Sequence, residues 1–154
     1  MATNARGTAI WLYDTTGTAV VKLGCPTSYS GIGLSRDITE SEACLETGET
    51  TKFTGNLKKN DITININWDA ENSSHKLIWD AVNNGTEDMA FVIGLSGDNT
   101  APTWASGDWS LATGRSWIKI VASVATMNID LSSPAYKGTI TLSVKTISII
   151  KATT

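Results

Sequence analysis

The chain of 154 residues has very little of the chemistry on which enzymes and metalloproteins depend. It contains one histidine, His75, and two cysteines, Cys25 and Cys44. The spacing of these cysteines matches no zinc or thioredoxin motif, and a single histidine cannot complete a zinc site. Gly31 and Gly33 lack the further glycine and the following helix of a dinucleotide-binding turn. The sequence therefore predicts no enzyme, no bound cofactor and no metal.

Charge is also scarce, because only 18% of the residues are charged. Twelve basic and fifteen acidic side chains give a net charge of -3, and the basic residues form no cluster. Proteins that hold nucleic acid by its phosphates need clustered Lys and Arg, so tight DNA binding is not expected. No apolar run approaches the roughly 18 residues that a membrane helix needs, and we expect no membrane partner.

The two cysteines leave two interpretations open. Cys25 and Cys44 can form a disulfide, or they can be free, buried or half-buried thiols in a reducing cytoplasm. We favour free thiols, because residues 1–7 lack the apolar run of a secretory signal.

Regular alternation of apolar and polar residues marks the best-defined strand, residues 61–68, in which every second residue is Ile or Trp. Residues 69–85 follow with capping candidates at 72–74, a terminal Gly85 and a stripe of apolar residues at helical spacing, Leu77, Ile78, Ala81 and Val82. The apolar segment 89–94 is short and β-branched, which favours a strand. This region therefore predicts strand, helix, strand, with the only helix of the chain.

The remaining segments are predicted to be strands and loops. Strands are expected at residues 7–14 and 18–23, joined by a turn at Gly17, and at 34–42, 116–127 and 136–147. Residues 43–60 contain few apolar side chains and are expected to form a long exposed polar loop, a feature that is usually functional or disordered. The fold class predicted is mainly β, a sandwich or barrel with one flanking α-helix, in a single domain over residues 1–154.

Three individual side chains allow both a structural and a functional interpretation. His75 is expected to be a surface or half-packed helix residue. Trp104 and Trp109 lie in a turn-rich segment, where exposed tryptophans can stack on sugar rings, so a carbohydrate-binding β-sandwich module is the alternative function. The favoured interpretation is that they cover apolar surface or enter a subunit interface.

The order of these segments resembles the major tail tube proteins of long-tailed, non-contractile bacteriophages. The resemblance lies in the opening strand at residues 7–13, the acidic stretch 37–42 before a polar loop, the strand 62–68, the single helix and the two closing strands. It covers most of the chain, although the segment 96–114 has no counterpart in that pattern.

The resemblance implies a structural virion protein, made in the host cytoplasm. Six copies would form a ring, and rings would stack into the tail tube through which DNA passes without binding. Other expected partners are the tape-measure protein and the tail terminator or tip proteins. Six chains of net charge -3 would give a ring about -18. Candidate lumen-facing residues are Asp37, Glu40 and Glu42, and candidate inter-ring loop residues are Glu46, Glu49, Lys52, Lys58 and Lys59.

Overall fold

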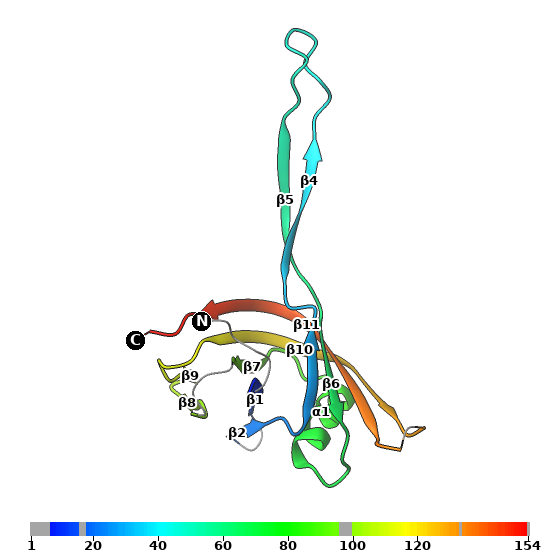
Figure 1. The fold of residues 1–154 in the computed structure, drawn as a ribbon, viewed down its shortest axis with the longest axis vertical. Helices are drawn as coiled ribbons and strands as arrows, with labels where there is room; N and C mark the ends of the chain where they lie inside the picture. Colours follow the sequence, from blue (N-terminus) through cyan, green and yellow to red (C-terminus); the bar gives the residue numbers. More distant parts are fainter. Residues whose placement is uncertain (1–6, 16–17, 96–99, 133, 154) are drawn as a thin grey trace.

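The computed structural model describes residues 7–15, 18–95, 100–132 and 134–153 as a curled β-sheet that carries one helix and a long projecting arm (Figure 1). The main sheet has seven strands in the order β2-β1-β7-β10-β11-β6-β3, and every neighbouring pair is antiparallel. Its strands are β1 (Ala9–Asp14), β2 (Ala19–Lys22), β3 (Pro26–Ser30), β6 (Ile62–Asn67), β7 (Met89–Gly94), β10 (Trp117–Asp130) and β11 (Lys137–Ile150). Two further pairs are β4 (Leu34–Glu40) with β5 (Lys52–Lys59), and β8 (Thr103–Ala105) with β9 (Asp108–Ser110).

This arrangement confirms the predicted fold class, mainly β with one helix among the described residues. The first two strands pair as predicted, although Thr16 and Gly17 of the turn between them lie outside the described residues. The two closing strands are each 14 residues long, and they pair with each other along nearly their whole length.

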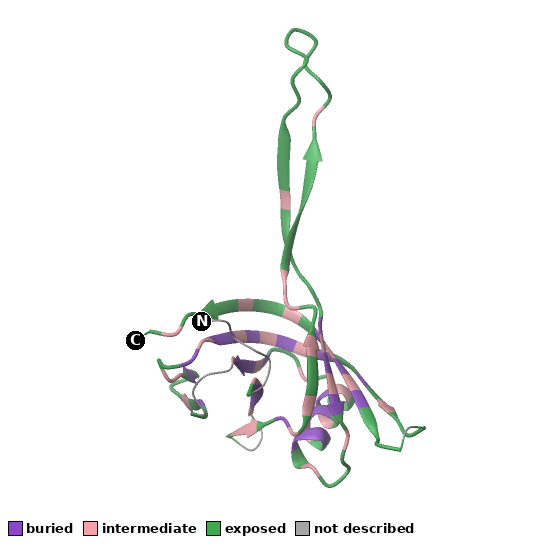
Figure 2. Cartoon of the chain, viewed as in Figure 1, coloured by how far each residue is buried: buried purple, intermediate pink, exposed green. Residues whose placement is uncertain are grey.

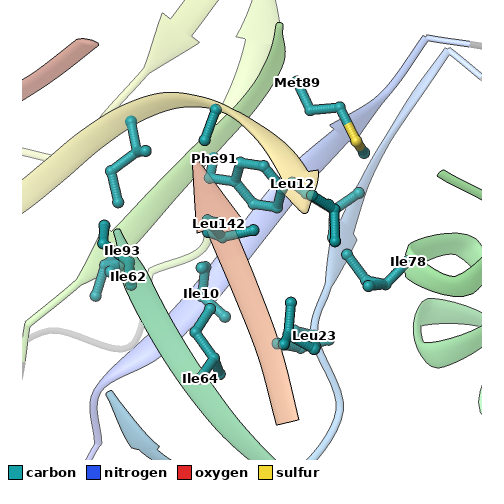
Figure 3. Close-up of a cluster of buried hydrophobic side chains, with 14 of the residues drawn as sticks. Ile10, Leu12, Leu23, Ile62, Ile64, Ile78, Met89, Phe91, Ile93 and Leu142 are labelled. Carbon is teal, nitrogen blue, oxygen red and sulfur yellow. The ribbon is translucent and has the colours of Figure 1, made fainter. Parts of the chain in front are cut away.

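The hydrophobic core lies between the helix and one face of the sheet (Figure 3). The alternating isoleucines of β6, Ile62, Ile64 and Ile66, are at most 1% exposed, as their period of two predicts. Ile140 and Leu142 of β11 are completely buried beside them. Because successive residues of a strand point to opposite faces, the residues between these positions form the second face of the sheet.

The helix α1 (Ser73–Asn84) has the caps that its sequence predicts. The side chain of Asn72 accepts a hydrogen bond from the Ser74 backbone N–H at 3.0 Å, and Gly85 ends the helix with φ of 64°. Ile78 and Ala81 pack into the core, whereas Trp79 is 48% exposed.

The prediction that His75 is a surface or half-packed helix residue is wrong, because His75 is 1% exposed. Nε2 donates to the Gly24 carbonyl oxygen at 2.7 Å, and Nδ1 accepts from the Asp69 backbone N–H at 3.0 Å. The neighbouring Ser74 hydroxyl accepts from the Gly24 N–H at 3.0 Å. The helix start is therefore tied to the segment before β3, a distant contact that the helical pattern does not reveal.

His75→Ala is expected to lower the free energy of unfolding by about 2–4 kcal/mol, because the Gly24 carbonyl and Asp69 N–H lose buried partners and a cavity forms. Urea denaturation followed by circular dichroism measures this loss. Lys76→Ala is the matched control, since Lys76 is the exposed next residue of the helix and should cost at most about 0.5 kcal/mol. Equal effects of the two substitutions would contradict a structural role of His75.

The arm consists of β4 and β5 and projects from the sheet with both of its faces in solvent (Figures 1 and 2). All seven residues of β4 are exposed, and only Gly55 of β5 is partly covered. The prediction of a polar loop over 43–60 is therefore wrong for residues 52–59, which form β5. The arm covers no core, so its apolar residues are not confined to one side and the alternation that marks a strand is weak.

Candidate assembly interface

Over part of four strands, β3, β6, β10 and β11, the second face of the sheet is polar and uncharged. We call it the polar face and define it by eight residues, Ser28, Ser30, Thr63, Asn65, Thr126, Asn128, Thr139 and Thr141, which lie opposite one another in the strand register. Asn65 Nδ2 donates to Ser28 Oγ at 2.7 Å, and Thr139 Oγ1 donates to Asn65 Oδ1 at 3.1 Å. These bonds fix the side chains of three neighbouring strands relative to one another.

Charged groups appear only at the rim of this face, in a groove of about 580 Å³ that also contains Asn65, Asn128 and Thr139. Asp130 and Lys137 lie opposite each other there. The Ser132 side chain and backbone donate to Asp130, which lowers the pKa of this exposed carboxyl and keeps it ionised. One acidic and one basic group leave the rim electrically balanced.

The structure places both sets of predicted site residues on the arm. Asp37 and Glu40 belong to β4 and Glu42 follows it, whereas Glu46 and Glu49 lie near the tip and Lys52, Lys58 and Lys59 belong to β5. Lys58 Nζ and Asp37 Oδ2 are 2.7 Å apart in an exposed ion pair, and Thr50 donates to Glu40 at 2.5 Å. The candidates for the lumen and for inter-ring contacts are therefore on one element, and none is part of the polar face.

Exposed apolar residues on the arm were not among the predicted site residues. Leu34 is 55%, Ile38 69% and Leu57 41% exposed. Leu34, Arg36 and Ile38 alternate along β4 and therefore point to the same side of the arm. Leu57 is the cross-strand partner of Arg36, so it lies on this side as well. In the sequence this row is marked only weakly, because Arg36 separates Leu34 from Ile38. Two-stranded ribbons are marginally stable alone, so an arm with uncovered apolar side chains is typical of a segment that packs against a partner.

The arm ends in a tight turn, in which the Gly48 N–H donates to the Cys44 carbonyl at 2.6 Å. Backbone N–H groups of Glu46 and Thr47 point at the Cys44 thiol and lower its pKa. Cys44 and Cys25 are both free, which confirms the favoured interpretation, but both are exposed, so the expectation that they are buried is wrong. Neither position lies over the core, since Cys44 is at the arm tip and Cys25 is in the turn between β2 and β3.

The two tryptophans proposed for sugar binding have their ring faces occupied within the chain. Trp109 is 9% exposed and packs with Trp11, Val92 and Trp117 in a second hydrophobic cluster. Trp104 stacks on Tyr13, with centroids 4.2 Å apart and planes at 10°, and meets Trp109 edge-on. The packing agrees with the favoured interpretation, in which these tryptophans cover apolar surface, and not with the alternative of an exposed sugar platform; they join β8 and β9 to the main sheet.

Tyr29 of β3 is directed towards the core, and its hydroxyl is buried without a hydrogen-bond partner among the described residues. Burial raises the pKa of Tyr29 to about 12. The folded value exceeds the unfolded value of 10, so the contribution of Tyr29 to stability is complete below pH 10 and is lost as the pH rises towards 12.

Tyr29→Phe removes a hydroxyl that has no partner, and is expected to leave the free energy of unfolding at pH 7 unchanged or to raise it by about 1 kcal/mol. Above pH 10 the variant should lose less stability than the wild type. Chemical denaturation of both proteins at pH 7 and pH 10.5 measures the two differences. A loss above about 1 kcal/mol at pH 7 would mean that the hydroxyl has a partner in solution.

Within the described part of the chain, no group of three or more His, Cys, Asp or Glu residues could hold a metal ion. Over the same residues, no helix has the length and apolar character needed to cross a bilayer.

Comparisons with a family model and with solved structures place this arrangement among known proteins. The family model described as phage tail tube, TTP, lambda-like, matches residues 1–152. A search of curated protein sequences gave no match. Among solved structures, the chain is similar to one from the sheath-tube complex of an extracellular contractile injection system, with TM-score 0.70, 16% identity, and coverage of 98% of this chain and 93% of that one.

Two further solved structures share the fold. One is the tube-terminating cap of the anti-feeding prophage, with TM-score 0.71, 16% identity, and coverage of 99% and 93%. The other is the Hcp1 protein of the E. coli EAEC 042 pathovar, with TM-score 0.51, 14% identity, and coverage of 94% and 90%. Because the family model extends over almost the entire chain, the protein belongs to the lambda-like phage tail tube family, whose members are structural components of the virion.

Proposed function

We propose that six copies of this chain form a ring and that rings stack into the tail tube that conducts DNA during ejection. The observation that carries this proposal is the combination of an uncharged polar face on the sheet with an exposed arm that projects from the same sheet. The polar face lines the lumen, and the arm makes the contacts between rings. The function needs no reaction centre, so the protein is not an enzyme.

Two strand edges support closure of the ring. β3 is the last strand of the sheet, and its outer edge is unpaired among the described residues. β7 pairs with β10 only over residues 117–122, so residues 123–130 of β10 pair on the β11 side alone within that part of the chain. The strands β10, β11, β6 and β3 thus have one open edge on β3 and another on β10, so the sheet of one copy can continue into the sheet of the next. Such a head-to-tail contact forms a closed ring when the rotation between copies divides a full turn.

The arm carries the residues proposed for contacts outside the ring. Leu34, Ile38 and Leu57 become buried when the arm packs on another copy, and Glu46, Glu49, Lys52, Lys58 and Lys59 are the inter-ring candidates. Asp37, Glu40 and Glu42 remain the acidic candidates for the lumen. The protein is made in the host cytoplasm, and its partners in the tail are the tape-measure protein and the terminator or tip proteins.

Mass measurement at increasing protein concentration tests the oligomer. Six chains of 16.4 kDa give about 98 kDa for a ring. Native mass spectrometry should detect this species, and electron microscopy should show rings or tubes. A protein that stays monomeric at millimolar concentration would contradict the proposal.

A lumen lined by neutral or acidic side chains is expected to let DNA slide, because a cationic wall would hold the polyanion by counterion release. Neither the isolated protein nor the tube should bind double-stranded DNA in 50 mM salt by fluorescence anisotropy. Asn65→Lys with Thr139→Lys should create binding that weakens as salt rises, whereas Asn65→Gln with Thr139→Ser should not. Tight, salt-dependent binding by the wild-type protein would contradict the account.

A further inference from the structure

The C-terminal half of β11 has an open edge. β6 pairs with β11 only from Lys137 to Leu142. Within the described residues, the following eight positions, 143–150, pair with β10 on one side and with no strand on the other. A free edge of this length, about 26 Å at 3.3 Å per residue, is a ready template for another strand.

The path of the chain explains why this edge is open. β5 runs almost directly into β6, since only Asn60 and Asp61 separate them. If the residues before Ile62 extended β6 within the sheet, they would lie beside residues 143–150 of β11. Instead, the chain leaves the sheet in the arm while β11 bends away from it (Figure 1). The base of β5 stays near β11, but among the described residues no strand of the same copy pairs with residues 143–150 on this side.

Apolar side chains lie along the open edge. Ile147 and Ile149 are the register partners of Ile120 and Ile118, which belong to the core and are 1% and 8% exposed. Ile149 is 74% exposed, although it lies beside these buried residues. An added strand would extend the core row by one strand and cover Ile149.

Strand β4 of the arm has matching properties. It is seven residues long, it is paired only with β5 among the described residues, and its outer edge is free. Leu34, Arg36 and Ile38 lie in one row of β4. In an antiparallel pairing with Leu34 opposite Ile149, Arg36 is opposite Ile147 and Ile38 is a diagonal neighbour of Ile147, within reach of a long side chain. The other row of β4, Ser35, Asp37 and Thr39, would then lie on the same side of the sheet as the polar face.

Charge distinguishes β4 from β5 as the added strand. Residues 137–154 contain three lysines and no acidic residue, and β5 likewise contains three lysines and no acidic residue. Residues 34–42 contain one arginine and three acidic residues. The open edge itself, residues 143–150, contains one charged residue, Lys145, whose Nζ lies 3.1 Å from Asp88 Oδ2. Opposite charges on neighbouring strands are favourable and like charges are not, so this edge suits β4, with two acidic residues and one basic, better than β5 with its three lysines.

We propose that residues 143–150 of β11 receive β4 from the arm of a second copy as an added strand, with Leu34 and Ile38 packed on Ile147 and Ile149. This inference rests on the proposed assembly and specifies which surface of the next copy the arm occupies.

Disulfide trapping in the assembled protein tests the pairing. In a Cys25→Ser, Cys44→Ser background, Ile38→Cys is combined with Ile147→Cys or with Ile149→Cys, because a disulfide needs Cα atoms within about 7 Å. The matched control combines Phe53→Cys with each of the same partners, since Phe53 is a similarly exposed residue of β5. Mild oxidation should give at least about tenfold more intermolecular cross-link for one Ile38 pair than for its control.

The outcomes separate this inference from the proposed function. Rings or tubes that form normally, with no excess of cross-link over the control, would overturn the pairing of β4 with β11 and leave the tube function intact. If neither the wild-type protein nor the Cys25→Ser, Cys44→Ser protein forms rings or tubes, both the strand pairing and the proposed tube function would be overturned. As a second measurement, Ile149→Asp should reduce assembly at least about tenfold more than Ser148→Asp, which adds the same charge one position away. Equal effects would also count against the inference.

Discussion

Removal of the arm is expected to abolish tube formation while the rest of the protein stays folded. Ser35 and Lys58 are opposite each other in the register, so an Asn-Gly turn can replace residues 36–57 and close the shortened ribbon. The variant lacks Ile38, Leu57 and all the charged inter-ring candidates except Lys58 and Lys59. Because the arm has no part in the core, circular dichroism and the melting temperature should stay close to those of the wild type.

Sedimentation and electron microscopy measure the effect on assembly. We expect no tubes at concentrations about a hundredfold above those at which the wild type assembles, because stable interfaces need extensive buried area. Ile38→Asp should reproduce most of this loss, and Thr39→Asp should have a smaller effect, since the two neighbours lie in opposite rows of β4. Normal tubes from the armless protein would show that the arm is dispensable.

The largest expected loss of stability follows from substitution of Arg115, which is only 3% exposed. Its guanidinium donates to the backbone carbonyls of Leu95, Gly7 and Gly94 at 2.6, 2.7 and 3.0 Å. It also lies 5.2 Å from the ring centroids of both Trp11 and Trp117. The side chain therefore joins the segment before β1, the end of β7 and the start of β10.

Arg115→Met keeps a long apolar side chain but removes every donor, and is expected to cost about 3–5 kcal/mol because buried carbonyls lose their partners. Guanidinium denaturation measures this loss. Lys119→Met is the control, because Lys119 forms a partly exposed ion pair with Asp108 at 2.8 Å, in which the lysine side chain is 29% and the aspartate side chain 65% exposed, and should cost at most about 1 kcal/mol. A cost below 1 kcal/mol for Arg115→Met would mean that these hydrogen bonds contribute little.

The spacing of apolar residues in the sequence was enough to predict the strands and the helix that bury one side in the core. β6 alternates because its isoleucines enter the core, and α1 begins and ends at the predicted caps, Asn72 and Gly85. β11 was predicted from the same alternation, and the polar residues Thr139 and Thr141 on its second side became part of the polar face.

The features that depend on distant contacts could not be predicted in this way. His75 is buried because Gly24, far away in the sequence, meets it, and Trp104 is covered because Tyr13 stacks on it. The arm was missed for a different reason. Its apolar residues meet no core within their own chain, so its sequence lacks the pattern that packing within one subunit imposes.

A reconstruction of the assembled protein by electron cryomicroscopy measures most directly which surfaces of the chain meet its copies. The account predicts a hollow tube of stacked six-membered rings, with Asn65 and Thr139 exposed to the channel and each arm in contact with another copy. A tube lined by the α1 side of the subunit, or arms that touch no neighbour, would contradict it.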